Sequence, residues 1–346
     1  MLRPLILTLS VLLVPACGGE PGDGTATAAS TGAASTGAAS SGSGTGSAGA
    51  TTELPTTGAE GSTSGAAATS DGSEVSGEAS TGAATPRRFL AVDNGKNQLL
   101  LVDAGGGGWS VPIPGGARDL QLVDDDQVLL SHGGGALELA LADGSEGWSV
   151  GGFSGVQTAR RLPGGNTLLG MQGNGDVNFT EVDPGGALVQ TLTVPGMLEL
   201  RLVRVLDDGH LLFTAILPNR VVEVDMTGAV VWEAPLPDKG YTAERLPGGD
   251  TLATAGEPCL VVRLSPAGDV VEQLGGEAMF PRVGLDWFSG FDLLANGNIV
   301  VANWLGHDAW GTGPHLVELT PDNQLVWQWE DFEAAMQVTN VLVLDE

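Results

Sequence analysis

The sequence predicts an all-β protein, a six-bladed β-propeller of four-stranded blades, which follows an export signal and a long polar tether. Three observations support this prediction. An apolar segment opens the 346-residue chain, a segment of almost only Gly, Ala, Ser and Thr follows it, and a repeat of about 40–50 residues then runs to the end. Each repeat contains two hairpin signatures, which gives the four strands of a propeller blade.

Residues 1–17, MLRPLILTLSVLLVPAC, have the charged start and short apolar run of an export signal. Their last four residues, VPAC, resemble a bacterial lipobox, which implies a lipid on Cys17 and attachment to a membrane through it; the alternative is an ordinary secretory signal. Gly18 after the cysteine, by resemblance to Gram-negative sorting, favours the outer membrane, on its periplasmic side or at the cell surface. Cys259 then has no disulfide partner, and EPCLVVRL predicts that it lies in a buried strand.

Residues 18–86 are expected to be a disordered tether, because they carry too little apolar surface to offset the entropy of ordering. The whole chain has a formal net charge of −28, and most of this charge lies in residues 87–346, the predicted propeller. Such an acidic surface argues against nucleic acid as a partner. An acidic surface that keeps an exported, monomeric protein soluble is the simpler interpretation.

The first hairpin of each repeat is centred on a turn, seen most clearly in RRLPGGNTLLG and AERLPGGDTLA. Equivalent segments are LQLVDDDQVLL, VRVLDDGHLLF and DLLANGNIVVA. Apolar residues flank an Asp, Asn or Gly turn in all five, as expected for two short strands joined by a tight turn. The turn positions used to align them are Asp126, Gly165, Gly209, Gly249 and Gly297.

The second hairpin is marked by segments such as VDMTGAVVW and LTPDNQLVW, and a tryptophan recurs at one of its positions. Because the position repeats, it predicts packing between blades rather than separate ligand sites. The four residues are Trp109, Trp148, Trp232 and Trp327.

The two ends of the repeat region complement each other. RFLAVDNGKNQLLLVD supplies the second and third strands of a blade, a fourth follows, and a first strand is missing. VTNVLVLDE, at the end of the chain, supplies only a first strand. We therefore expect the C-terminal strand to join the N-terminal blade and close the ring of six blades.

The repeat RxLPxGNxLL…VxExDxxGxVVW resembles six-bladed propellers of the bacterial arylsulfotransferase type and, more loosely, quinoprotein-like propellers. In that family, histidines eight residues before the turn glycine lie at the channel mouth and serve sulfate transfer. None of the matched positions here is histidine, so the resemblance implies the fold and not the reaction. The matched residues are Arg118, Gln157, Arg201, Tyr241, Ser289 and Thr339.

Two loops are longer than their counterparts in the other repeats: residues 275–290 and residues 303–315. Blade-to-blade connections and loops between second and third strands emerge on the same face, so these loops predict a site. We expect them to bind a carbohydrate, peptide or protein, without cofactor or metal. The expected ligand contacts are Arg282, Trp287, Asn303, Trp304, His307, Asp308 and Trp310.

Other interpretations of these loops remain open. A metal site would use His307, Asp308 and His315, although their spacing matches no recognised ligand pattern. A diverged transferase, hydrolase or lyase would use His307 or His315 with Asp286 or Asp292, and an acid–base pair of His307 with Asp308 is also possible. A third interpretation is a structural scaffold of the cell envelope.

A second candidate group lies five residues before each turn, where equivalent side chains are expected to face the channel. The two arginines of this group could hold an anion while its acids supply a proton. We prefer a ring of mutually compensating charges between blades. The residues are Gln121, Arg160, Arg204, Glu244 and Asp292.

Overall fold

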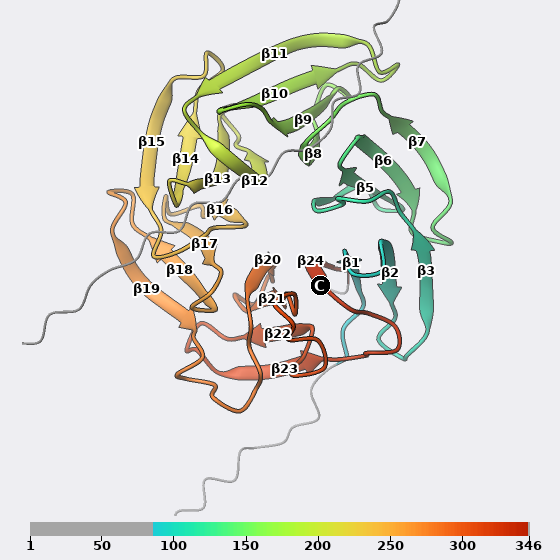
Figure 1. Ribbon diagram of the computed structural model, residues 1–346, viewed down its shortest axis with the longest axis vertical. Coiled ribbons are helices and arrows are strands. Elements are labelled where there is room, and N and C mark those ends of the chain that lie inside the picture. The colour runs from blue at the N-terminus through green and yellow to red at the C-terminus, as the bar shows by residue number, and fades with distance from the viewer. Residues whose placement is uncertain (1–85, 345–346) are drawn as a thin grey trace, which may run out of the picture. The chain divides into compact units, whose positions relative to one another are not determined.

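The computed structural model describes residues 86–344, which form six antiparallel four-stranded sheets arranged as a six-bladed β-propeller (Figure 1). The predicted fold class is confirmed. Within residues 86–344 the regular elements are all strands, and no helix there is long and apolar enough to span a membrane. The predicted signal segment with Cys17, and the predicted tether apart from Pro86, lie outside the described residues.

In the first three blades, the strands follow one another from the centre of the propeller outward. Blade 1 contains β24 (Val338–Val343), β1 (Phe89–Asp93), β2 (Gln98–Val102) and β3 (Gly108–Pro112). Blade 2 contains β4 (Leu120–Asp124), β5 (Gln127–His132), β6 (Gly135–Ala140) and β7 (Glu146–Val150). Blade 3 contains β8 (Val156–Arg161), β9 (Thr167–Gln172), β10 (Asp176–Val182) and β11 (Leu188–Pro195).

The last three blades repeat this order. Blade 4 contains β12 (Leu198–Val205), β13 (Leu211–Leu217), β14 (Arg220–Val224) and β15 (Val230–Pro235). Blade 5 contains β16 (Ala243–Arg245), β17 (Thr251–Ala255), β18 (Leu260–Leu264) and β19 (Val270–Gly275). Blade 6 contains β20 (Phe288–Leu293), β21 (Ile299–Asn303), β22 (Leu316–Leu319) and β23 (Leu325–Trp329).

The LPGG segments are the turns between the first and second strands of a blade. Gly165 and Gly249 have φ angles of 89° and 90°, a left-handed conformation that glycine adopts without steric cost. Cys259 differs from its expected position: it is buried, but it lies in the turn that precedes β18 and has φ 52°.

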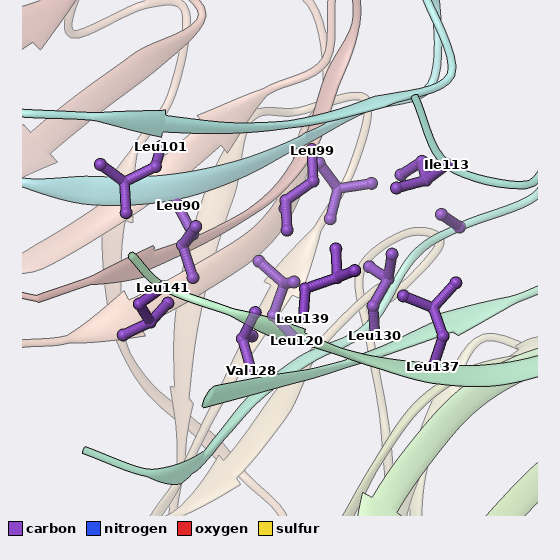
Figure 2. Packing of buried hydrophobic residues seen from close by; sticks show 12 residues of the cluster. Leu90, Leu99, Leu101, Ile113, Leu120, Val128, Leu130, Leu137, Leu139 and Leu141 are labelled. Carbon is purple, nitrogen blue, oxygen red and sulfur yellow. The ribbon is translucent and has the colours of Figure 1, made fainter. Parts of the chain in front are cut away.

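The hydrophobic core lies between neighbouring blades. Figure 2 shows the cluster that joins blade 1 to blade 2, where Leu90 and Leu99 of blade 1 meet Leu120, Val128 and Leu139 of blade 2. All five side chains are at most 4% exposed. Since each blade is covered by its neighbours on both sides, packing around the ring stabilises every sheet.

The four recurring tryptophans lie on the outer strands of blades 1, 2, 4 and 6, and each connects its blade to the next, as the repeat predicts. The indole nitrogens of three of them donate 2.9 Å hydrogen bonds to carbonyl groups of the following blade; the pairs are Trp109 with Leu141, Trp148 with Pro184 and Trp232 with Pro266. Trp327 packs edge-on against Phe89 of blade 1, with ring centroids 5.9 Å apart.

The arginine of the RLPGG segment explains why this segment is repeated. Arg245 donates to the carbonyl of Gly249 in its own turn at 3.1 Å and pairs with Glu223 of the preceding blade at 2.5 Å. Its guanidinium also lies over the ring of Trp232 on that blade. The segment is therefore an interblade contact, formed by one side chain with three kinds of partner.

The ring closes in blade 1 as predicted. β24 pairs with β1 in antiparallel register, Val341 opposite Ala91, so the C-terminal strand becomes the innermost strand of the N-terminal blade. Arg87 forms a two-point ion pair with Glu318 of blade 6 at 2.7 and 3.0 Å, and Glu318 is 2% exposed. The pair therefore fastens blade 6 to the residues at the start of blade 1.

Candidate functional site

A pocket of about 360 Å³ opens at one end of the propeller channel. Its walls come from the starts of the innermost strands and from the loops between second and third strands. All innermost strands start at the same end of the channel, so these segments meet there. The lining residues are Asn94, Arg118, Glu199, Arg201, Ile216, Lys239, Tyr241, Trp287, Ser289, Trp304, His307, Gln337 and Thr339.

Five of the six positions matched to the family's histidines line this pocket: Arg118, Arg201, Tyr241, Ser289 and Thr339. The sixth, Gln157, does not line it, and its side-chain amide donates to the carbonyl of Gly155 at 3.3 Å. Equivalent positions of the repeat thus converge at the channel mouth, where they carry other side-chain chemistry.

An aromatic row forms one wall of the pocket. Tyr241, Trp287, Trp304 and His307 contact one another in sequence through edge-to-face ring pairs. The ring centroids are 5.8, 6.0 and 5.0 Å apart along the row. Trp287, Trp304 and His307 come from the two enlarged loops, so three of the expected ligand contacts lie together.

Two glycines make room for the indoles of this row. A Cβ atom on Gly256 would lie 2.0 Å from the ring of Trp287, and one on Gly306 would lie 2.0 Å from the ring of Trp304. Any larger residue would therefore displace a wall of the pocket. The sequence alone does not reveal this role of the two glycines.

Asn303, which the sequence suggests as a ligand contact, is fully buried and fixes the two loops instead. Its amide oxygen accepts from the backbone N–H groups of Asp286 and Trp287 at 2.8 and 3.3 Å. Its amide nitrogen donates to the carbonyls of Gly284 and Pro314 at 3.1 and 2.8 Å. The amide is thus occupied by the backbone of both loops, which positions the aromatic row.

The charged groups of the pocket are mainly basic. Arg201 is about four-fifths buried, donates to the carbonyl of Leu200 at 3.2 Å and lies 3.7 Å from the carboxylate of Glu199. Burial, and next the positive charge of Arg118, lower the pKa of Arg201. Lys239 pairs with Glu257 at 2.8 Å, and both side chains are largely exposed.

His307 lies at the edge of the aromatic row and faces an acid. Its Nδ1 atom is 3.8 Å from Oδ2 of Asp286, and the side chains are 55% and 20% exposed. Arg282, Asp308 and Trp310 are exposed and do not line the pocket. Trp310 instead packs edge-on against Phe332, with ring centroids 5.9 Å apart.

His315 lies away from the pocket wall that holds His307. It is fully buried beside Trp329 and Phe332, with ring centroids 5.4 and 5.0 Å away. Burial lowers the pKa of its imidazole. Within residues 86–344, the proposed ligands His307, Asp308 and His315 do not converge as a metal site would require. The structure therefore does not support that alternative.

One group in the described residues does converge: Asp208, His210 and Glu223. The pair of His210 with Glu223, at 2.8 Å, is part of the repeat, because polar side chains at the same positions also pair in other blades. These pairs are Asn166 with Glu181, Asn298 with Glu318 and, with the acid on the other strand, Asp250 with Arg263. The group is thus a structural feature of blade 4.

The predicted channel residues do come together. Gln121, Arg160, Arg204, Glu244 and Asp292 all line one cavity of about 170 Å³. Their central partner is Asp119, which the repeat pattern did not indicate; it is fully buried and pairs with Arg160 at 2.7 Å and with Arg204 at 3.4 Å. All three guanidinium nitrogens of Arg160 donate hydrogen bonds: one to Asp119 and two to the carbonyls of Leu120 and Val203. The arrangement favours charge compensation between blades over ligand binding.

Comparisons with known proteins support the fold alone. No family model and no curated protein sequence matches the chain. A protein of unknown function from Bacteroides caccae is 22% identical, with a TM-score of 0.64 over 75% of this chain and 100% of that one. A streptogramin B lyase is 13% identical, with a TM-score of 0.50 over 72% and 84%. A calcium-binding protein, regucalcin from Agrobacterium tumefaciens, is 14% identical, with a TM-score of 0.49 over 74% and 92%.

The fold and the site together define a class of protein. The chain is a six-bladed β-propeller with an aromatic, basic pocket at one mouth of its channel. The similar folds include a lyase and a protein of unknown function, so the fold does not determine what the pocket does.

Proposed function

We propose that the chain is an exported binding protein whose propeller holds a small, ring-bearing ligand in the channel-mouth pocket. The observation that carries this proposal is the row of Tyr241, Trp287, Trp304 and His307 along one pocket wall. Aromatic side chains of this kind offer large apolar surfaces against which a sugar or an aromatic ring packs.

The construction around the row supports binding. The pocket volume of about 360 Å³ falls in the range of small-molecule sites. The Asn303 amide holds both loops in place, and Gly256 and Gly306 leave space for the indoles. A pocket prepared in this way loses little entropy when a ligand enters.

The proposal extends to how the protein is held in the cell. A lipid on Cys17 would attach the chain to the bacterial envelope, with the outer membrane favoured, and residues 18–86 would give the propeller reach. The ligand would then be an extracytoplasmic compound. Carbohydrates fit the aromatic row well; a peptide or protein would have to insert a ring-bearing side chain.

The test is a binding screen on the purified protein with ring-bearing probes: glucose, N-acetylglucosamine, benzamide and benzoate, measured by calorimetry. We expect one or more to bind, and Trp304→Ala and Gly306→Ala to weaken that binding by about tenfold or more. Gly248→Ala is the matched control, because a Cβ there meets no atom within 4 Å. Binding that both pocket variants leave unchanged would refute the site, and capture of no probe would favour a structural scaffold.

A second candidate, a diverged enzyme, is favoured by one observation: His307 faces Asp286 at the edge of the pocket. A histidine paired with a carboxylate is a common arrangement for general acid–base catalysis. Asp292 lies in the channel cavity and accepts from the Val343 N–H at 2.7 Å, and His315 is buried elsewhere, so neither joins this pair. Turnover of a bound probe that disappears in both His307→Gln and Asp286→Asn would establish the enzyme, whether transferase, hydrolase or lyase.

A further inference from the structure

Hydrogen-bond donors on the basic wall of the channel-mouth pocket have no acceptor in the described part of the chain. The Nε atom of Arg118 and the hydroxyl of Tyr241 are both buried without a hydrogen-bond partner. Tyr241 is 2% exposed, and both side chains line the pocket. Buried donors of native proteins are almost always satisfied, so these two require an explanation.

The positive charge of the same wall is only partly compensated by acids. Within residues 86–344 no carboxylate forms an ion pair with Arg118, and Glu199 lies 3.7 Å from Arg201 with its own side chain 39% exposed. Arg118 and Arg201 line the same pocket, and burial, followed by the positive charge of Arg118, lowers the pKa of Arg201. A protein with a net charge of −28 has many acids to place beside them, yet this pocket holds one.

We propose that Arg118, Arg201 and the Tyr241 hydroxyl bind an oxyanion group of the ligand, either a carboxylate or a phosphate. This inference rests on the proposed function, and it adds the chemical class: an organic anion whose ring packs against the aromatic row. An oxyanion offers acceptors to both guanidinium groups and to the hydroxyl, and its negative charge offsets the repulsion between the arginines.

The position of Tyr241 connects the two halves of such a ligand. Its ring begins the aromatic row through Trp287, while its hydroxyl belongs to the unsatisfied donors. A ligand that fills the pocket would therefore meet apolar ring surface on one side and donors on the other. Lys239 is not required, because it already pairs with Glu257.

The experiment compares matched anionic and neutral probes by calorimetry on the full chain. Benzoate is paired with benzamide, phenyl phosphate with phenol, and glucuronate and glucose 6-phosphate with glucose. We expect an anion to bind roughly 10- to 100-fold more tightly than its neutral counterpart, and Arg118→Gln or Arg201→Gln to remove that preference. Tyr241→Phe, which deletes only the hydroxyl, should lower the affinity for the anion by about fivefold or more.

The controls separate the two proposals. Arg263→Ala removes an arginine that pairs with Asp250 and Glu272 and does not line the pocket, so it should leave the preference intact. One outcome would overturn the oxyanion site and keep the binding function. In it, anionic and neutral probes bind equally, and Trp304→Ala weakens their binding while the arginine variants do not. If no probe binds, both proposals fail. If the arginine variants do not fold, two other measurements test the oxyanion site. Anion binding that neither Tyr241→Phe nor added salt weakens would overturn it.

Discussion

The guanidinium carbon of Arg245 lies 4.5 Å from the ring centroid of Trp232, so the turn of blade 5 rests on the outer strand of blade 4. Arg161 lies at the same distance over Trp148, between blades 3 and 2. Each arginine also pairs with a glutamate of the preceding blade, Glu223 or Glu138. These contacts add directional bonds to the apolar packing between blades.

Arg245→Ala is expected to lower the free energy of unfolding by about 2 kcal/mol. The substitution removes a cation–π contact and leaves Glu223, which is 12% exposed, without its arginine. Urea unfolding followed by circular dichroism measures the change. Arg88→Ala is the control, because its pair with Asp103 is about half exposed and should contribute less than 1 kcal/mol. Equal losses in both variants would contradict an interblade role for Arg245.

Glu318→Gln should destabilise the ring closure by about 3 kcal/mol, since it breaks a two-point pair whose carboxylate is nearly inaccessible. The double variant Arg87→Met/Glu318→Gln should be less destabilised than the sum of the single variants. Chemical unfolding of the three proteins gives this coupling. Additive losses would show that the two side chains act independently.

The fold was predictable from sequence because a propeller repeats one unit, and each repeat confirms the others. The turn glycines, the tryptophans and the complementary chain ends all indicated the same six blades. The position of Cys259 was not predictable to the residue. Its segment is apolar like a strand, and only the structure shows that the turn extends to Cys259.

The site was predictable in position more than in role. Loop length located Trp287, Trp304 and His307, and alignment of the repeats located Arg118 and Arg201 as departures from histidine. Asn303 was expected to contact a ligand because it belongs to the same polar and aromatic loop, yet its amide forms hydrogen bonds with the backbone of both loops. Gly256 and Gly306 could not be recognised, because their role depends on indoles that reach them only in the folded chain. Asp119 was missed because it lies two residues before Gln121, the residue of its blade at the predicted channel position.

Cys259 should be unreactive in the folded protein. Burial raises the pKa of its thiol to about 12, so at pH 8 about one molecule in 10,000 carries the thiolate. In the Cys17→Ser protein, where Cys259 is the one remaining cysteine, we expect no fast reaction with Ellman's reagent until denaturant is added. Rapid labelling of the native protein would mean that the turn before β18 opens readily.

Cys17→Ser also tests the predicted lipid anchor. In a bacterial host fed an alkyne-labelled fatty acid, the wild-type chain should incorporate the label and sediment with membranes. The variant should do neither, because it lacks the thiol that the lipid requires. Gly18→Ala is the control for changes near the cleavage site. A soluble, unlabelled wild-type chain would support the ordinary secretory signal instead.

His315 should make the propeller less stable in mild acid. Burial lowers the pKa of its imidazole in the folded state, so below the unfolded value of about 6.5 the unfolded chain binds a proton that the folded chain does not. Stability from this group is therefore present at neutral pH and is lost as the pH falls. The nearby charges of Asp93 and Asp331 oppose the shift, and that of Lys96 reinforces it.

The measurement is urea unfolding at pH 7.5 and pH 5 for the wild type and for His315→Gln, which cannot be protonated. The variant can be less stable at both values, since it alters packing against Trp329 and Phe332. The free energy of unfolding that the variant loses between pH 7.5 and pH 5 should nevertheless be smaller than the loss in the wild type. If His315→Gln and the wild type lose the same stability, the acid sensitivity arises from other groups.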